Sequence, residues 1–119
     1  MIFINLSNHL FSSWSAKQLE AAKQYGDLAE MAFPNIEPNS STEVVRMLAT
    51  AYVTYIMEHY PAENLTVHIM GEQTFCYHVV QQLKQRNIRC VASTTERIVK
   101  EIKGNKRIVE FTFVQFREY

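Results

Sequence analysis

The order of apolar and polar positions along the chain predicts strands alternating with helices. Residues 2–6 form a short apolar run, which is typical of a strand buried on both faces. Ser15 and Gln18 then form a capping-box pattern that predicts the start of a helix, and Gly26 would end it. A second strand is predicted over residues 27–33.

The middle of the chain repeats this order. Ser40 and Glu43 form a second capping pattern and predict a helix with an apolar stripe. The stripe consists of Val44, Leu48, Ala51, Tyr52, Tyr55, Ile56 and Tyr60. A third strand, residues 65–70, runs directly into Gly71, and residues 74–86 predict a third helix. Its inward residues would be Phe75, Val79, Val80 and Leu83.

The last third of the chain changes to alternation. Residues 88–92 predict a fourth strand, and the alternating segments 98–102 and 107–116 predict a β-hairpin around a Lys103-Gly104-Asn105 turn. The expected fold class is α/β: a Rossmann-like three-layer sandwich, with a mainly parallel sheet and a C-terminal antiparallel β-hairpin. A chain of 119 residues suffices for one such core, so residues 1–119 are expected to form a single domain.

Charge is unevenly distributed along the chain. Twelve basic and twelve acidic side chains give a net charge of zero, which argues against coating of long nucleic acids. Residues 1–64 carry three basic and seven acidic side chains, whereas residues 65–119 carry nine and five. An anion-binding surface would therefore draw on the second half.

The sequence predicts a cytoplasmic location and reduced cysteines. The first residues show no secretory signal pattern, and the most apolar stretch, residues 47–57, is too short to span a membrane. A cytoplasmic protein without membrane contact is expected. Cys76 and Cys90 lack the spacing of a zinc site or a CxxC pair and are expected to be buried, reduced thiols.

Candidate chemistry gathers where the predicted strands end, because open parallel sheets bind ligands at their carboxyl edge. Small polar residues follow the first, third and fourth strands. They are Ser7, Asn8, His9, Ser12, Ser13 and Trp14; Gly71, Glu72, Gln73 and Thr74; and Ser93, Thr94, Thr95, Glu96 and Arg97. A glycine turn that opens a helix suits an anion, so the pattern predicts a phosphate or nucleotide ligand.

Three of these residues keep two interpretations. His9 would transfer a proton or contact the ligand, or it would be a surface loop residue or a partner of Glu72. Trp14 would stack on a base or cover the core. Arg97 would neutralise a phosphate or join a cross-strand ion pair.

Common enzyme motifs are missing from the chain. It has no GxGxxG, Walker A, GxSxG or HExxH pattern, and neither a cofactor nor a metal site is expected. Phosphodiester cleavage, if present, would therefore be metal independent, with a ribose 2′-hydroxyl displacing the 5′-oxygen.

Three segments carry a resemblance to a known family: FINLSNH (3–9), HIMGEQTF (68–75) and FVQFREY (113–119). With them, the chain resembles small stand-alone CRISPR-associated proteins of Rossmann-like (CARF-like) fold. Proteins of that group act in antiviral defence and bind cyclic oligoadenylate messengers, and several are ring nucleases. The resemblance implies a homodimer that holds the ring across its two-fold axis. Contacts would come from Ser7, Asn8, His9, Gly71, Glu72, Gln73 and Thr74.

One departure from the family and two alternatives remain. The best-matching loops lack a basic residue, so Arg97, beside Ser93 and Thr94, would supply the charge. Trp14 would lie near an adenine, and His9 or Ser7 would assist phosphodiester transfer. The alternatives are a non-catalytic sensor or sponge for the same ring, and a protein-interaction subunit. The latter would use the hairpin edge and the aromatic series Phe111, Phe113, Phe116 and Tyr119.

Overall fold

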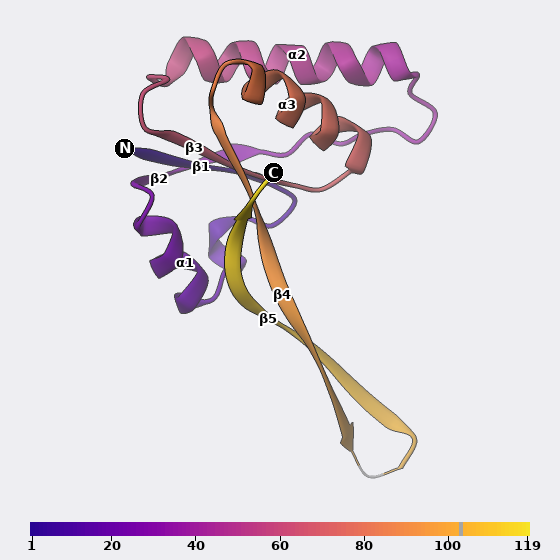
Figure 1. Ribbon diagram of the computed structural model, residues 1–119. Helices are drawn as coiled ribbons and strands as arrows, with labels where there is room; N and C mark the ends of the chain where they lie inside the picture. Colours follow the sequence, from indigo (N-terminus) through magenta and orange to yellow (C-terminus); the bar gives the residue numbers. More distant parts are fainter. Residues whose placement is uncertain (103) are drawn as a thin grey trace.

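A five-stranded sheet organises the chain (Figure 1). The computed structural model describes residues 1–102 and 104–119. In chain order the elements are β1 (Ile2–Ser7), the 3-10 helix η1 (Phe11–Ser13), α1 (Ala16–Lys23), β2 (Asp27–Ala32), α2 (Thr42–His59), β3 (Leu65–Met70), α3 (Gln73–Gln85), β4 (Arg89–Ile102) and β5 (Lys106–Glu118). The sheet order is β2-β1-β3-β4-β5; the first three neighbouring pairs are parallel and the β4–β5 pair is antiparallel. The predicted Rossmann-like α/β sandwich is confirmed.

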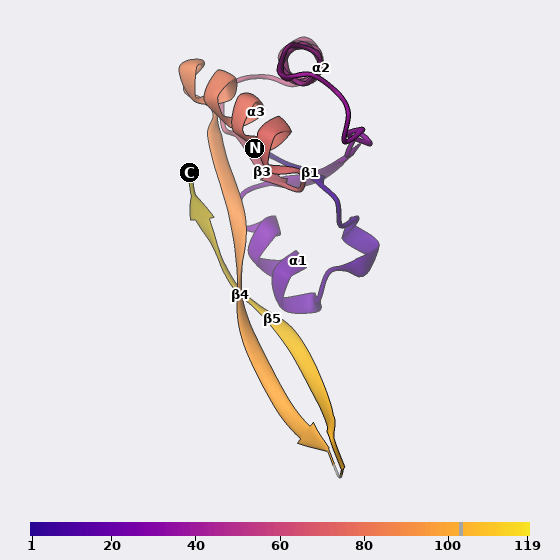
Figure 2. The ribbon, with the colours of Figure 1, turned by 90° about the vertical axis from the view of Figure 1, so that its right-hand side faces the viewer.

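Helices cover both faces of the sheet, as predicted. Figure 2 shows α1 on one face and α2 with α3 on the other. Apolar side chains fill each of the two spaces. Beneath α2 and α3 the core includes Ile4, Leu6, Val67, Ile69 and the inward side of α3, whose predicted residues are all buried. Beneath α1 lies a smaller aromatic cluster built on Phe3 and Trp14.

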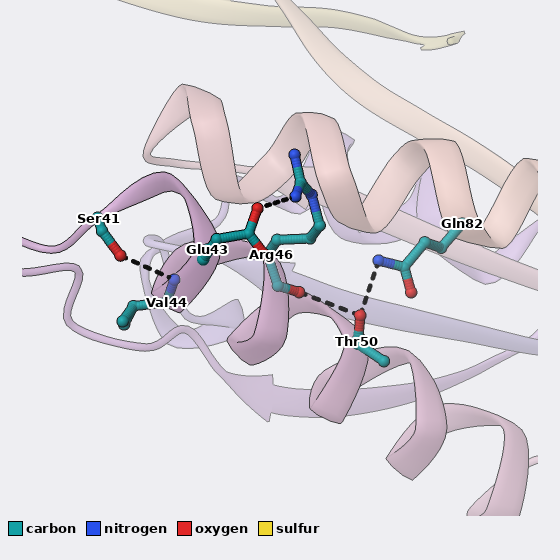
Figure 3. Close-up of polar contacts among 6 residues, drawn as sticks. All are labelled: Ser41, Glu43, Val44, Arg46, Thr50 and Gln82. Atoms are coloured by element: carbon teal, nitrogen blue, oxygen red, sulfur yellow. Dashed lines mark hydrogen bonds and ion pairs between the residues drawn. The ribbon is translucent and has the colours of Figure 1, made fainter.

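Helix α2 differs in detail from its prediction. Its N-cap is Ser41, whose Oγ accepts a hydrogen bond from the Val44 amide at 3.2 Å, and not Ser40 (Figure 3). Its buried side chains are Val45, Ala49, Val53 and Ile56. Of the predicted stripe, Ile56 is buried, Leu48, Tyr52 and Tyr60 are partly buried against the core, and Val44, Ala51 and Tyr55 are exposed. Apolar residues occupy several sides of this helix, and contact with α3 decides which side is buried. Thr50 marks that contact, because its Oγ1 accepts from Gln82 Nε2 of α3 at 3.0 Å.

The predicted loop after the fourth strand is wrong. Residues 93–97 lie inside β4, which continues without a break to Ile102. A register shift between Thr94 and Thr95 lets both strands of the hairpin continue, since Thr94 Oγ1 bridges to the Gln115 backbone at 3.1 and 3.2 Å. Of the predicted turn, Gly104 has a φ of 89°, and Lys103 lies outside the described residues.

The outer part of this hairpin projects from the body of the molecule (Figures 1 and 2). We call residues 95–102 and 104–113 the arm. Beyond the arm's base, β4 and β5 pair only with each other among the described residues. The arm therefore carries Arg97 away from the carboxyl edge of the sheet.

Candidate functional site

A row of polar side chains crosses the sheet beneath α1. Strand register places Asn5 between Glu30 of β2 and His68 of β3. Asn5 Nδ2 donates to Glu30 Oε2 at 3.1 Å, and His68 Nδ1 lies 2.9 Å from Asn5 Oδ1. His68 Nε2 lies 2.8 Å from Ser93 Oγ, which also accepts from Gln18 Nε2 at 3.0 Å. We call Glu30, Asn5, His68 and Ser93 the polar row.

The hydrogen bonds of the row fix the state of His68. The Asn5 carbonyl oxygen can only accept, so His68 donates from Nδ1 and its Nε2 accepts from the Ser93 hydroxyl. Burial, and secondarily the charge of His9, lowers the pKa of His68 to about 4. Phe3, Trp14 and Phe116 surround the ring. His68 is therefore a neutral, fixed imidazole at neutral pH.

The same row fixes the loop that follows β1. The main-chain oxygen of His9 accepts from Asn5 Nδ2 at 2.8 Å, from Ser7 Oγ at 2.9 Å and from Trp14 Nε1 at 3.0 Å. Glu30 Oε2 accepts from the Phe11 amide at 2.6 Å. Within the FINLSNH segment, the side chains of Asn5 and Ser7 therefore hold the His9 backbone in place.

Sequence-predicted residues of this loop divide into buried and exposed groups. Ser7 is 2% exposed and donates to Asn5 Oδ1 at 2.7 Å, so its hydroxyl is engaged inside the protein. Trp14 is 8% exposed and covers the core, which is the second of its two interpretations. Asn8 and His9 are exposed. The Asn8 amide donates to the Met70 carbonyl at 3.1 Å, which joins this loop to the turn after β3.

The turn at Gly71 serves packing and helix capping. Gly71 has a φ of 153°, and a Cβ on it would lie 2.3 Å from the Phe33 ring. Glu72 caps α3: its carboxylate accepts from the Thr74 amide at 2.7 Å and from the Phe75 amide at 3.0 Å. The carboxylate also accepts from the Thr74 hydroxyl. That bond, followed by the two amide bonds, lowers the pKa of Glu72. The Thr74 and Phe75 amides at the start of α3, where an anion would bind, are therefore occupied by the Glu72 side chain.

Two grooves lie beside this turn. The larger, of about 830 Å³, is lined from the first turns of α2 and α3 and from the segment before α2. Its residues are Ile36, Glu37, Pro38, Ser40, Thr42, Val45, Glu72, Gln73, Thr74, Tyr77 and His78. The smaller, of about 340 Å³, is lined by Met70, Gly71, Gln73, Cys76, Tyr77, Val80 and Tyr119. Gln73 and Tyr77 line both grooves, which therefore meet at the first turns of α3.

The structure separates the three predicted segments. Gly71, Glu72, Gln73 and Thr74 lie at the grooves. Ser93 and Thr94 are tied into the sheet by their hydrogen bonds. Arg97 lies on the arm opposite Phe111, outside the lining of either groove. The expectation that Arg97 supplies charge beside the turn is wrong for a single copy, because β4 does not end at Ala92.

Sequence reasoning missed four residues of this region. Asn5 and His68 could have been suspected, because polar residues inside runs of a buried strand need buried partners. Tyr77 and His78 gave no signal, since an outward position on a helix is ordinary until a groove is seen beside it. Tyr77 is 61% exposed.

Two further findings concern metals and membranes. Over residues 1–102 and 104–119, no cluster of three His, Cys, Asp or Glu side chains is arranged to hold a metal ion. In the same part of the chain, none of the helices has the length and apolar character needed to cross a membrane. Cys76 and Cys90 are free and buried, as predicted, and burial raises the pKa of each thiol to about 12.

Fold and site together define a small Rossmann-like α/β protein with paired grooves at the carboxyl edge of its sheet. The chain belongs to the uncharacterized protein MJ1673 family, whose model matches residues 1–117. Comparison with curated proteins gives no match, and neither does comparison with solved structures.

Proposed function

We propose that this protein binds a cyclic oligoadenylate, as a CRISPR-associated protein of the CARF-like type, in the grooves around the first turns of α3. The observation that carries this proposal is the 830 Å³ groove, which opens at the edge where sheets of this topology bind nucleotides. Its volume falls in the range of small-molecule sites. The resemblance of the FINLSNH and HIMGEQTF segments supports the choice of ligand.

Recognition in this proposal depends on stacking and hydrogen bonding. Tyr77 projects an exposed ring where the grooves meet and would stack on an adenine, a contact worth about 1–3 kcal/mol per base. Gln73 and Thr74 would bond to ribose or base. The lining of the large groove contains no Lys or Arg among the described residues and includes the carboxylates of Glu37 and Glu72. Because Glu72 occupies the amides at the start of α3, His78 and the start of α2 would face the phosphates.

Cleavage is the second part of the proposal. A ribose 2′-oxygen would form a bond to the adjacent phosphorus while the bond from phosphorus to the 5′-oxygen breaks, leaving a 2′,3′-cyclic phosphate end. His9 lies outside the lining of both grooves, on the exposed loop that the Asn8–Met70 hydrogen bond joins to the turn after β3. It would reach the ring from that loop and accept the proton of the 2′-hydroxyl, and the 5′-oxygen would take up a proton from water. Asn5 and Ser7 are positioning residues, since both hold the His9 backbone. The step as written needs no metal ion.

A second copy belongs to this proposal. A ring of four or six nucleotides has symmetry that one asymmetric chain lacks, so two grooves would face it from opposite sides. The ring is therefore expected to be held between the grooves of two copies, as in a homodimer.

Binding is tested by thermal stabilisation with cyclic tetra-adenylate and cyclic hexa-adenylate, with linear oligoadenylates of equal length as controls. One ring is expected to raise the melting temperature, because a ligand that binds only the folded state stabilises it. Tyr77→Ala should weaken this effect, whereas Tyr55→Ala should not, since Tyr55 is an exposed tyrosine outside both grooves. If neither ring stabilises the folded protein, the proposed ligand is wrong.

Cleavage is tested by incubating the labelled ring with the protein and EDTA. Linear product is expected without added metal, and His9→Ala should slow its formation. Product that appears only after a divalent ion is restored would contradict the metal-independent step. Stabilisation by a ring that stays intact would instead assign the protein as a sensor or sponge.

A further inference from the structure

The arm lacks the layer that normally supports a β-hairpin. Among the arm's described side chains only Phe113 is buried, and neither core cluster includes a described residue between 92 and 115. An isolated two-stranded hairpin is marginally stable in water, and three or more strands are usually needed. Pairing with additional strands would therefore stabilise the arm.

One face of the arm carries large exposed apolar side chains beside the charged Arg97, Glu101 and Arg107. Cross-strand pairing places Thr95 with Phe113, Arg97 with Phe111 and Val99 with Val109 on this face. Phe111 is 67% exposed, Val99 46% and Val109 40%. The face continues the aromatic cluster beneath α1, since Phe113 packs against Phe116 with ring centroids 4.9 Å apart.

The arm also presents an open strand edge. Strand β3 pairs with β4 only from Arg89 to Val91, so the β3-side edge of β4 has no partner strand beyond that point among the described residues. We propose that this edge pairs with the same edge of a second copy, in an antiparallel β4–β4 contact centred on Val99. The two arms would then form one four-stranded sheet in the order β5-β4-β4-β5.

Among registers centred on the face that carries Val99, the charges of β4 favour this one. Centring on Val99 places Arg97 of each copy opposite Glu101 of the other, which forms two opposite-charge pairs. Centring on Arg97 or on Glu101 would instead oppose like charges. Neither side chain takes part in an ion pair among the described residues, whereas Lys100 already pairs with Glu110 at 3.4 Å on the other face. Charged edge residues usually prevent strand pairing, but here they are complementary to their own copy.

This contact is separate from the proposed ligand site. The grooves lie at α2 and α3, and the arm extends past α1 on the opposite side of the sheet (Figure 2). The arm-mediated dimer therefore forms without ligand, and it stands or falls independently of ring binding.

Cross-linking through an engineered thiol tests the register. Residues directly opposite in an antiparallel pair have Cα atoms about 4.5–5.5 Å apart, within disulfide reach. Val99→Cys is expected to give a disulfide-linked dimer under mild oxidation, because the native cysteines are buried. Val109→Cys is the matched control: it lies on the same face, three strand spacings or about 14 Å from its counterpart. Linkage at 109 but not at 99 would overturn the register in favour of a β5 edge.

Charge exchange tests the same contact without cysteines. The unmodified protein is expected to be a dimer by light scattering in the absence of nucleotide. Arg97→Glu and Glu101→Arg, each alone, oppose like charges twice and should weaken the dimer about tenfold, whereas the double variant should restore it. A monomeric parent protein, or single variants that dimerise as tightly as the parent, would refute the proposal.

Discussion

Burial of one histidine gives this fold a built-in dependence on pH. His68 is 2% exposed and held as a neutral ring by Asn5 and Ser93, so protonation would break the bond that its Nε2 accepts. Because its folded-state pKa is about 4, below the ordinary value of 6.5, the unfolded chain binds the proton more readily. The stabilisation is complete above pH 6.5 and is lost as the pH falls towards 4.

We therefore predict that acidification from pH 7 to pH 5 lowers the free energy of unfolding by about 2 kcal/mol through His68 alone. Urea unfolding at the two pH values measures this loss. His68→Gln should remove most of the difference, whereas His59→Gln, at an exposed site on α2, should leave it intact. An unchanged pH dependence in His68→Gln would show that other groups cause it.

Position 71 requires glycine, because the Phe33 ring occupies the space that a Cβ would need. We predict that Gly71→Ala lowers the free energy of unfolding by more than about 1 kcal/mol, since alanine would adopt a positive φ and contact Phe33. Gly104→Ala is the control: its φ of 89° is also unfavourable, but open space surrounds it. In a Phe33→Ala background the cost at Gly71 should fall. Equal cost in both backgrounds would mean that the ring is not the obstacle.

At the scale of the elements, the sequence predicted the regular parts well. Buried runs such as residues 65–70, and caps such as Ser15 with its 3.2 Å bond from Gln18, depend on neighbours in the chain. What it missed depends on partners far away. The buried side of α2 is chosen by α3, and the polar segment 93–97 stays extended because β5 pairs with it.

Capping by Glu72 is a prediction about α3 as a whole. Glu72→Ala removes the acceptor for the Thr74 and Phe75 amides and should cost about 1 kcal/mol of stability. Because the folded-state pKa of Glu72 is lowered, its contribution is present at neutral pH and is lost only at pH values below its ordinary 4.5. Glu72→Asn should retain part of the cap. Urea unfolding at pH 7 measures the stability of both variants. An equal loss of stability in Glu72→Ala and Glu72→Asn would exclude capping as the cause.

For the molecule as a whole, the topology predicted that grooves lie at the carboxyl edge of the sheet. It did not predict which side chains fill the space at that edge. The carboxyl ends of β1 and β3 do meet, yet Trp14 and the polar row fill the space under α1. The usable grooves lie on the other face, at the starts of α2 and α3. Side-chain volume decides this outcome, and a single sequence gives no measure of it.

The arm and the body are expected to be separable. Deleting residues 97–100 and 108–111 removes four matched pairs and keeps the alternation of faces, because an even number leaves the side-chain period unchanged. The shortened protein should keep its melting temperature within a few degrees at low concentration, since both core clusters remain. It should be monomeric without nucleotide and should still be stabilised by the ring, because the grooves are untouched. A protein that unfolds when the arm is shortened would show that the arm supports the body, and retained dimers would place the contact elsewhere.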